Sequence, residues 1–242
     1  MNIPQVAIIG YGKMGHEIEN QLLKIGATIT ATIDNENEWE IKEKELKNSD
    51  VAIEFSIPSM AVKNMYRCFD IGLPVVCGTT GWSNEEEQVI DYCKKTSHAL
   101  IFGSNFSIGA NLFFKINELT AKLMNRQTQY DVMIEETHHI AKKDIPSGTA
   151  ITIANTIMNQ IDRKNGWTLQ NEDTLDKINI TAHRIGNVPG IHTVQYQSAY
   201  DSIVLTHTAF NRTIFAEGAV RAAQWLIEHG GIHRFQDIFM EV

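Results

Sequence analysis

Hydrophobic and polar positions alternate in a regular order over the first hundred residues of the chain. Short apolar runs, each closed by glycine or small polar residues, are typical of buried strands. Five such runs are expected to be strands, at residues 5–9, 27–33, 51–55, 73–77 and 99–102. After the first run, apolar residues recur at helical spacing, at Met14, Ile18, Leu22 and Ile25. Buried strands separated by helices predict an α/β fold, a doubly wound parallel sheet of the Rossmann type whose ligand lies at the carboxyl ends of the strands.

The pattern changes after residue 106. A long helix is expected over about 110–125, a strand over 130–135 and a helix over 150–158. Three further strand-like runs lie at 177–182, 191–196 and 202–207, and the short turn at 200–201 indicates antiparallel pairs. Residues 159–176 are polar and are expected to form a surface connection. These features predict a second, α+β domain.

The last helix is expected to return to the first domain. Residues 217–226 have a helical pattern that places Ala216, Val220, Ala223 and Ile227 on one face, which would cover the first sheet. The predicted domains are therefore residues 1–106 plus 213–242, and residues 107–212.

A glycine-rich turn connects the first strand to the first helix. Gly10 allows a tight turn, Gly12 lets the backbone approach a pyrophosphate, and Gly15 allows close packing of helix on strand. Asp34 ends the second strand 19 residues after Gly15, where a carboxylate is expected to bind a ribose hydroxyl. A glycine turn without a ligand is the alternative, but the agreement of strand, glycines, helix and acid favours a dinucleotide cofactor.

Two later loops are expected to line the nicotinamide half of the cofactor cleft, because each follows a predicted strand of the same sheet. They contain Gly78, Thr79 and Thr80, and Ser104, Asn105 and Phe106. Ordinary connecting loops remain the alternative for each residue taken alone.

The densest chemistry lies in residues 136–150, which read Glu-Thr-His-His-Ile-Ala-Lys-Lys-Asp-Ile-Pro-Ser-Gly-Thr-Ala. Its basic residues are expected on a loop between a strand and a helix. The first N–H groups of a helix have no partner inside the helix, so residues 147–149 could present donors to an anion, with Lys142 and Lys143 nearby. A plain turn with a helix cap is the alternative for any single residue. A plain turn explains the whole run poorly, because clustered positive charges repel one another unless a ligand or an acidic side chain compensates them.

Composition excludes some classes of partner. The chain of 242 residues is long enough for a substantial core, and its net charge of −8 argues against nucleic acid or an anionic membrane. Its three cysteines, Cys68, Cys77 and Cys93, form no C-x-x-C pair, which indicates neither a disulfide framework nor a zinc ribbon. Without a signal-peptide pattern or an apolar run of about 18 residues, the protein is expected in the cytoplasm.

The run 136–150 resembles the E-x-H-H-x-x-K-x-D-x-P-S-G-T-A signature of the dihydrodipicolinate reductase family, the 4-hydroxy-tetrahydrodipicolinate reductases of diaminopimelate and lysine biosynthesis. The similarity extends to residues 10–15, 78–81, 104–107 and 211–221, in the family's order. The central signature is highly specific, whereas the glycine motif alone is not.

This resemblance implies a homotetrameric NAD(P)H-dependent reductase with a Rossmann domain and a substrate domain that also builds the tetramer. It implies hydride transfer to C4 of an unsaturated cyclic dicarboxylate and protonation of the adjacent carbon. By position, His138 and Lys142 would be the proton-donating pair, and no metal is expected. The residues expected to bind substrate are His139, Ser147, Gly148, Thr149 and Arg212. Those expected to bind NADH or NADPH are Gly10, Tyr11, Gly12, Lys13, Met14, Gly15, Asp34, Gly78, Thr79, Thr80, Ser104, Asn105 and Phe106.

The chain departs from the family pattern at Asn35, where members that favour NADPH often carry a basic residue, although Lys13 could still reach a 2′-phosphate. It is also shorter than many members. Two hydrolase functions conflict with the sequence. The chain lacks the H-E-x-x-H motif of a zinc hydrolase and the G-x-S-x-G motif of a serine hydrolase. Another dehydrogenase, such as an aspartate dehydrogenase, and a non-catalytic dinucleotide sensor remain alternatives.

Overall fold

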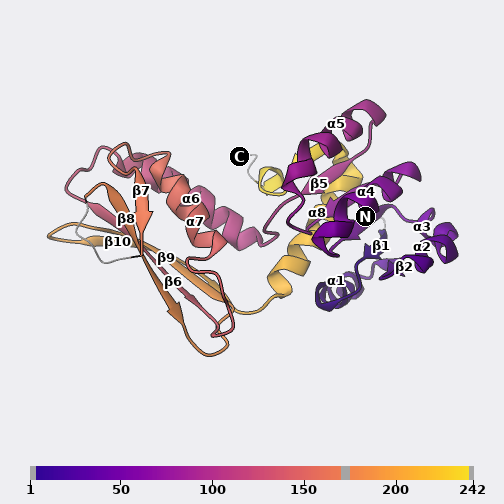
Figure 1. The fold of residues 1–242 in the computed structure, drawn as a ribbon, viewed down its shortest axis with the longest axis horizontal. Helices are drawn as coiled ribbons and strands as arrows, with labels where there is room; N and C mark the ends of the chain where they lie inside the picture. The colour runs from indigo at the N-terminus through magenta and orange to yellow at the C-terminus, as the bar shows by residue number, and fades with distance from the viewer. Residues whose placement is uncertain (1–3, 170–174, 240–242) are drawn as a thin grey trace. The chain divides into compact units, whose positions relative to one another are not determined.

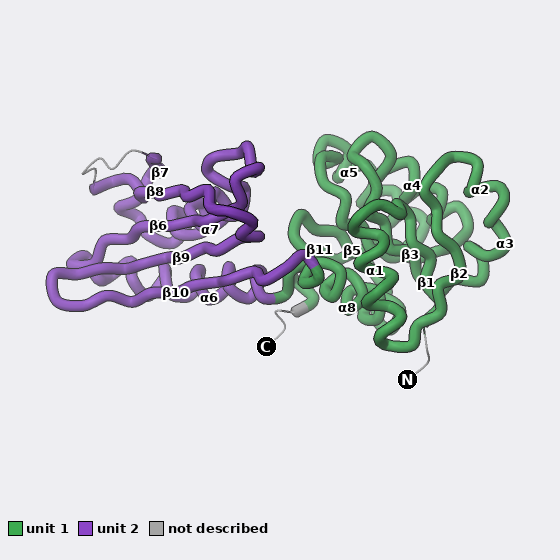
Figure 2. Tube along the Cα trace, turned by 90° about the horizontal axis from the view of Figure 1, so that it is seen from below, with its two compact units in different colours: residues 1–108, 213–242 green, residues 109–212 purple. Residues whose placement is uncertain are grey.

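A computed structural model of the chain describes residues 4–169 and 175–239. The chain divides into two compact units, shown in Figure 2. Unit 1 is taken from residues 1–108 and 213–242, and unit 2 from residues 109–212. Within the described residues, none of the helices has the length and apolar character needed to cross a membrane.

Unit 1 is built on a six-stranded parallel sheet in the order β11-β5-β4-β3-β1-β2 (Figure 1). The strands are β1 (Gln5–Ile9), β2 (Thr28–Ile33), β3 (Val51–Glu54), β4 (Val75–Cys77), β5 (Leu100–Phe102) and β11 (Ile232–Arg234). The helices are α1 (Lys13–Lys24), α2 (Asn37–Ile41), α3 (Glu43–Leu46), α4 (Pro58–Asp70), α5 (Glu86–Thr96) and α8 (Thr213–His229), with short 3₁₀ turns η1 (Ser83–Glu85) and η2 (Asp237–Phe239).

Apart from Gln5 at the start of β1 and Glu54 at the end of β3, the central strands are apolar because both faces of this sheet are covered. Successive residues of a strand point to opposite faces. In β1, Val6 and Ile8 pack into a core shared with α1 and α8, whereas Ala7 and Ile9 pack into a core shared with α4 and α5. The predicted doubly wound α/β sheet is confirmed.

Most predicted elements of unit 1 are present, with three differences. The sequence did not predict β11 or the short helices α2 and α3. Helix α8 returns to this sheet as expected, with Ala216, Val220 and Ala223 buried. Ile25 and Ile227, expected on the buried faces of α1 and α8, are instead 44% and 40% exposed. Ile25 follows the last residue of α1, so it has left the helical register.

Unit 2 is a five-stranded mixed sheet in the order β10-β9-β6-β8-β7, with one face covered by two helices. The strands are β6 (Asp131–His138), β7 (Gly166–Thr168), β8 (Lys177–Arg184), β9 (Gly190–Gln197) and β10 (Ser202–Ala209). The helices are α6 (Ile108–Met124) and α7 (Gly148–Met158). Val132 and Ile134 of β6 and Val194 and Tyr196 of β9 pack against these helices.

Two expectations for unit 2 need correction. Strands β8 and β9 are consecutive but do not pair, because β6 lies between them, parallel to β8 and antiparallel to β9. Only β9 and β10 form the expected antiparallel hairpin. The segment 159–176 was expected to be a polar surface connection; it contains β7 and a buried Ile161, while residues 170–174 lie outside the described part of the chain.

Candidate functional site

The three glycines of the first turn have different surroundings. Gly10 has a φ of +90°, and a Cβ there would lie 2.4 Å from the carbonyl oxygen of Phe55. A Cβ on Gly15 would lie 2.4 Å from the carbonyl oxygen of Gly10, whereas a Cβ on Gly12 would meet nothing within 4 Å. Gly10 and Gly15 are therefore required by the fold, and Gly12 leaves open space that a ligand's phosphate can approach.

Asp34 lies beside this turn. The backbone N–H of Tyr11 donates a hydrogen bond to Oδ1 of Asp34, with a distance of 2.9 Å. Asp34 borders a pocket of about 230 Å³ at the carboxyl ends of β1, β2 and β3. The strand order reverses between β1 and β3, so this is the topological switch point where open α/β sheets bind ligands. The pocket is lined by Ile9, Gly10, Gly12, Ile33, Asp34, Asn35, Glu36, Trp39, Phe55, Ser56, Ile57, Met60 and Asn64.

These residues fit the adenosine half of a dinucleotide. The turn offers open backbone, the carboxylate is positioned for a ribose diol, and Trp39 and Met60 offer apolar surface for a base. Lys13 and Met14 begin α1 directly after the turn.

A second pocket of about 240 Å³ lies after β4 and β5. It brings together four residues from the two predicted nicotinamide loops and their neighbours, Thr79, Thr80, Gly103 and Ser104. Gly78 is needed for packing, since a Cβ there would overlap the ring of Phe55. The ring of Phe106 is 2% exposed and packs on Phe235, so only the backbone of Phe106 is left to contact a cofactor.

The chemistry of unit 2 begins on β6. Alternate residues of this strand are buried, which places Glu136 and His138 on the same face as Val132 and Ile134. In register, Glu136 lies opposite His192 of β9, and His138 lies opposite Arg184 of β8. His138 was expected on a loop, but it is the last residue of the strand.

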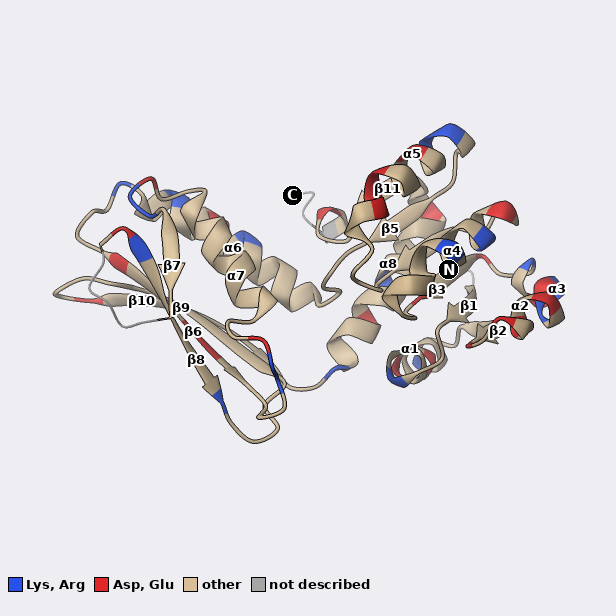
Figure 3. Ribbon diagram, viewed as in Figure 1, with Lys and Arg blue, Asp and Glu red and all other residues tan. Residues whose placement is uncertain are grey.

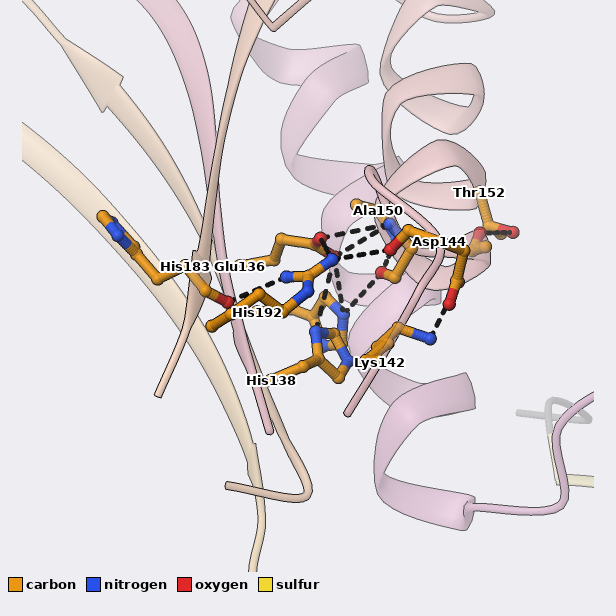
Figure 4. A network of polar contacts seen from close by, with 11 residues as sticks. Glu136, His138, Lys142, Asp144, Ala150, Thr152, His183 and His192 are labelled. Carbon is orange, nitrogen blue, oxygen red and sulfur yellow. Dashed lines mark hydrogen bonds and ion pairs between the residues drawn. The ribbon is translucent and has the colours of Figure 1, made fainter. Parts of the chain in front are cut away.

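Glu136 is the centre of a buried polar network (Figure 4). Both of its carboxylate oxygens accept from the backbone N–H of Ser147 at 3.1 Å, and Oε1 also accepts from Nη2 of Arg184 at 3.1 Å. Oε2 lies 3.6 Å from Nδ1 of His138 and 3.8 Å from Nε2 of His192. The carboxylate therefore ties three strands of the sheet to the start of α7.

Ser147 is the N-cap of α7. Its hydroxyl oxygen accepts from the N–H of Ala150 at 3.1 Å and lies 3.2 Å from Nε2 of His192. Since the N–H of Ser147 is bonded to Glu136, it is not a free donor for an anion, contrary to the expectation from sequence. In the described part of the chain, the N–H groups of Gly148 and Thr149 have no hydrogen-bond partner, so these two remain available at the positive end of the helix.

Lys142 stands next to this cluster, as Figure 4 shows, and Nζ forms an ion pair with Oδ2 of Asp144 at 2.8 Å. The carboxylate of Asp144 therefore compensates part of the positive charge of this segment. His139 follows His138 at the end of β6 and is half-buried, and Lys143 is exposed. Arg212 is exposed and follows β10 in the chain.

Burial sets the charge state of the two buried histidines. Burial lowers the pKa of His138, partly opposed by the Glu136 carboxylate and assisted by the charge of Lys142. Burial also lowers the pKa of His192, to about 3, with a smaller contribution from His138. The Arg184 guanidinium neutralises Glu136, which limits how far that carboxylate can stabilise a protonated imidazole. Both rings are therefore neutral near pH 7.

Ligand atoms of Glu136, His138 and His192 lie within 4.8 Å of one another, a spacing that a metal ion could bridge. The carboxylate, however, already accepts from a guanidinium and a backbone N–H. This donor set is that of a hydrogen-bonded network that orients His138 and Ser147, rather than of a preformed metal centre.

Comparison with known proteins decides the family. The sequence model described as "Dihydrodipicolinate reductase, N-terminus" matches residues 4–106, and the one described as "Dihydrodipicolinate reductase, C-terminus" matches residues 109–239. The chain belongs to the dihydrodipicolinate reductase family. Members of this family are NAD(P)H-dependent oxidoreductases, so the expectations of an enzyme and of a nicotinamide cofactor are confirmed.

Several relatives share this family. The 4-hydroxy-tetrahydrodipicolinate reductase of Christiangramia forsetii is 44% identical over 98% of both chains. The enzyme of the same name from Buchnera aphidicola is 38% identical over 81% of this chain and 74% of its own. In fold, the chain matches the solved "Dipicolinate bound Dihydrodipicolinate reductase from Paenisporosarcina sp. TG-14" with a TM-score of 0.77, at 23% identity, over 98% of this chain and all of that one.

Sequence reasoning missed Arg184 and His192 and gave no role to Glu136. Two signals were available. Glu136 breaks the apolar face of β6, and His192 does the same on the face of β9 that carries Val194 and Tyr196. A buried polar residue in the middle of an apolar face needs a partner, and here the partners are one another.

Proposed function

We propose that the chain catalyses the NAD(P)H-dependent reduction of 4-hydroxy-tetrahydrodipicolinate, via dihydrodipicolinate, to tetrahydrodipicolinate in diaminopimelate and lysine biosynthesis. Membership of the family supports this reaction. The observation that carries it is the start of α7, where two backbone N–H groups are free and belong to the same strand–loop–helix segment as Lys142 and the buried His138.

Unit 2 would bind the substrate's carboxylates. The N–H groups of Gly148 and Thr149 receive one carboxylate at the positive end of α7, a common arrangement for anions. The hydroxyl of Ser147 fixes the position of this helix start through Ala150 and His192. A second carboxylate needs another cation, for which Lys142, His139 and Arg212 are the candidates.

Lys142 would supply the proton. Its ammonium group is held by Asp144 and lies beside His138, whose neutral ring can accept a proton from Nζ or pass one on. The orientation of His138 is restricted on both sides. Nδ1 faces Glu136, and Nε2 would be 3.2 Å from a Cβ at position 190, where the chain has glycine.

Unit 1 would bind the cofactor through Gly12, Asp34 and the loops at 78–80 and 104–106. When bound, the nicotinamide supplies the hydride for the reduction. Gly10, Tyr11, Lys13, Met14 and Gly15 shape the turn that receives the pyrophosphate.

We propose further that the enzyme is a cytoplasmic homotetramer formed through unit 2. All three cysteines are buried free thiols, which supports a reducing compartment. The sheet face that α6 and α7 do not cover presents Met133 and Val204, 37% and 52% exposed, in register on either side of Gln195. Exposed apolar residues on a sheet face are typical of an assembly surface.

The reaction is tested by following the oxidation of NADH or NADPH with substrate generated by dihydrodipicolinate synthase. Replacing His138 or Lys142 with alanine should lower turnover by about 10²- to 10⁴-fold while leaving the cofactor dissociation constant almost unchanged. Lys143→Ala, at an exposed neighbouring lysine, is the matched control. Wild-type turnover in a variant lacking both His138 and Lys142 would remove them from the mechanism.

The two anion sites can be tested by inhibition. Pyridine-2,6-dicarboxylate should compete with substrate, and pyridine-2-carboxylate should bind far more weakly, because only the former can occupy both sites. Equal inhibition by the two compounds would contradict a site built for a dicarboxylate.

A further inference from the structure

The adenosine pocket of unit 1 has a charged cluster at its edge. Glu36 follows β2 and lines the pocket two residues after Asp34. Its Oε1 accepts a hydrogen bond from Nζ of Lys63 at 2.8 Å and another from Nη2 of Arg67. Both cations lie on α4, one helical turn apart, and they share a single carboxylate oxygen. Figure 3 shows acidic residues on α2 and α3, the short helices that follow β2 in the chain.

The side chain of Arg67 is held more firmly than that of Lys63. The guanidinium of Arg67 lies 5.1 Å from the centre of the Trp39 ring, and its side chain is 29% exposed. Its Nη1 atom is buried and has no hydrogen-bond partner among the described residues. Lys63 and Glu36 are about half exposed, so their side chains can move without disturbing the core. Arg67 is thus a positioned cation with an unused donor, and Glu36 is a movable anion.

Other charged residues near this edge are already engaged. Glu38 pairs with Lys42 at 2.9 Å and accepts from the N–H of Asp34. Asp34 accepts from the N–H of Tyr11 and so stays beside the glycine turn. Of the acids that line the pocket, Glu36 is the one that holds the two α4 cations.

We propose that Glu36 determines the choice between NADH and NADPH by occupying a 2′-phosphate site formed by Lys63 and Arg67. This inference rests on the proposed function, because it assumes a dinucleotide in the pocket. With the diol of NADH, Asp34 accepts the ribose hydroxyls and the Glu36 cluster stays intact. The phosphate of NADPH must displace the Glu36 carboxylate before it can bind the two cations.

The charges explain the direction of the effect. A 2′-phosphate carries nearly two negative charges and three acceptor oxygens, and Arg and Lys bind it through charge-assisted hydrogen bonds. With Glu36 present, the cluster of one acid and two bases offers little net attraction, and Asp34 adds repulsion. Without the carboxylate of Glu36, both cations are free. Lys63 and Arg67 would then take the place of a basic residue at position 35, where this chain has asparagine.

The test measures dissociation constants of NADH and NADPH by fluorescence titration at low ionic strength, in the full-length wild type and in Glu36→Gln. The substitution should tighten NADPH binding by about tenfold or more and change NADH binding by less than about twofold. Adding Arg67→Met to Glu36→Gln should abolish the gain. Glu43→Gln removes a similar exposed ion pair with Lys47, 2.5 Å long and away from the pocket, and should change neither constant.

The possible results separate the two proposals. If Glu36→Gln leaves the ratio of the two constants unchanged, or tightens both cofactors equally, Glu36 does not select between them. Persistence of the gain after Arg67→Met would also overturn the inference. If the wild type binds neither cofactor, the proposed function itself fails.

Discussion

Because His192 is buried, we predict that the stability of the protein falls as the pH is lowered. This ring is 5% exposed, and burial lowers its pKa from 6.5 to about 3. In the unfolded chain, His192 has its ordinary pKa, so between pH 3 and 6.5 the unfolded state binds more protons than the native state. The contribution of the neutral ring to stability is therefore complete above pH 6.5 and is lost progressively as the pH falls towards 3.

The magnitude follows from the difference in proton binding. At pH 7.5 neither state is protonated at His192, and the effect is close to zero. At pH 5 the unfolded chain is protonated and the native protein is not, which lowers the free energy of unfolding by about 2 kcal/mol, since one pKa unit is worth about 1.4 kcal/mol. For a chain of this length, a loss of that size lowers the unfolding temperature by roughly 4–8 °C.

His192→Gln removes the titrating group and keeps an amide that can bond to Ser147. Thermal unfolding of wild type and variant should be compared at pH 5 and pH 7.5, following the fluorescence of Trp167, the tryptophan of unit 2, with the others replaced. The variant should lose about 2 kcal/mol less than wild type between the two pH values. His229→Gln, at an exposed histidine of α8, should behave like wild type. Equal losses in wild type and His192→Gln would refute a neutral, buried His192.

Three further variants probe other parts of the molecule. Gly10→Ala places a Cβ against Phe55 at a positive φ and should lower the unfolding temperature by several degrees. Gly12→Ala should unfold like wild type and bind NADH more weakly. The same outcome for both variants would contradict their different roles. Glu136→Gln leaves the Arg184 guanidinium, 15% exposed, without its carboxylate. The free energy of unfolding, measured by urea denaturation, should fall by roughly 3 kcal/mol. A loss near zero would show that other partners suffice for Arg184. Thr149→Pro removes one free N–H group from the start of α7 and should raise the KM for substrate about tenfold, and a parallel rise in the KM for cofactor would argue against a local effect.

The sequence predicted the elements whose signal is local. The first five strands of unit 1 lie in mostly apolar runs, and the first glycine turn has its strand, helix and acid in order, so both could be recognised without tertiary information. The short helices α2 and α3 were missed because only Leu46 of their residues is buried. They are held by pairs four residues apart, Glu38 with Lys42 and Glu43 with Lys47, a pattern that is visible in the sequence.

The polar network of unit 2 could be predicted only in part. The motif at 136–150 drew attention to His138 and Lys142, but the partners of Glu136 come from strands 48 and 56 residues away. Their meeting depends on β6 being inserted between β8 and β9, and strand order is set by tertiary packing rather than by local sequence. The role of Ser147 was misjudged for the same reason, because its N–H is bonded to a residue on another element.

The division of unit 1 between the two ends of the chain affects how the protein can fold during synthesis. Helix α8 supplies Ala216, Ala219, Val220 and Leu226 to the core around β1 and β3, and β11 pairs with the edge of β5. A ribosome delivers the whole of residues 109–212 before these last elements emerge. A nascent chain therefore has one apolar face of its first sheet uncovered until α8 and β11 have been synthesised. Messages truncated shortly before residue 213 would yield chains with a finished unit 2 and an exposed, aggregation-prone first sheet.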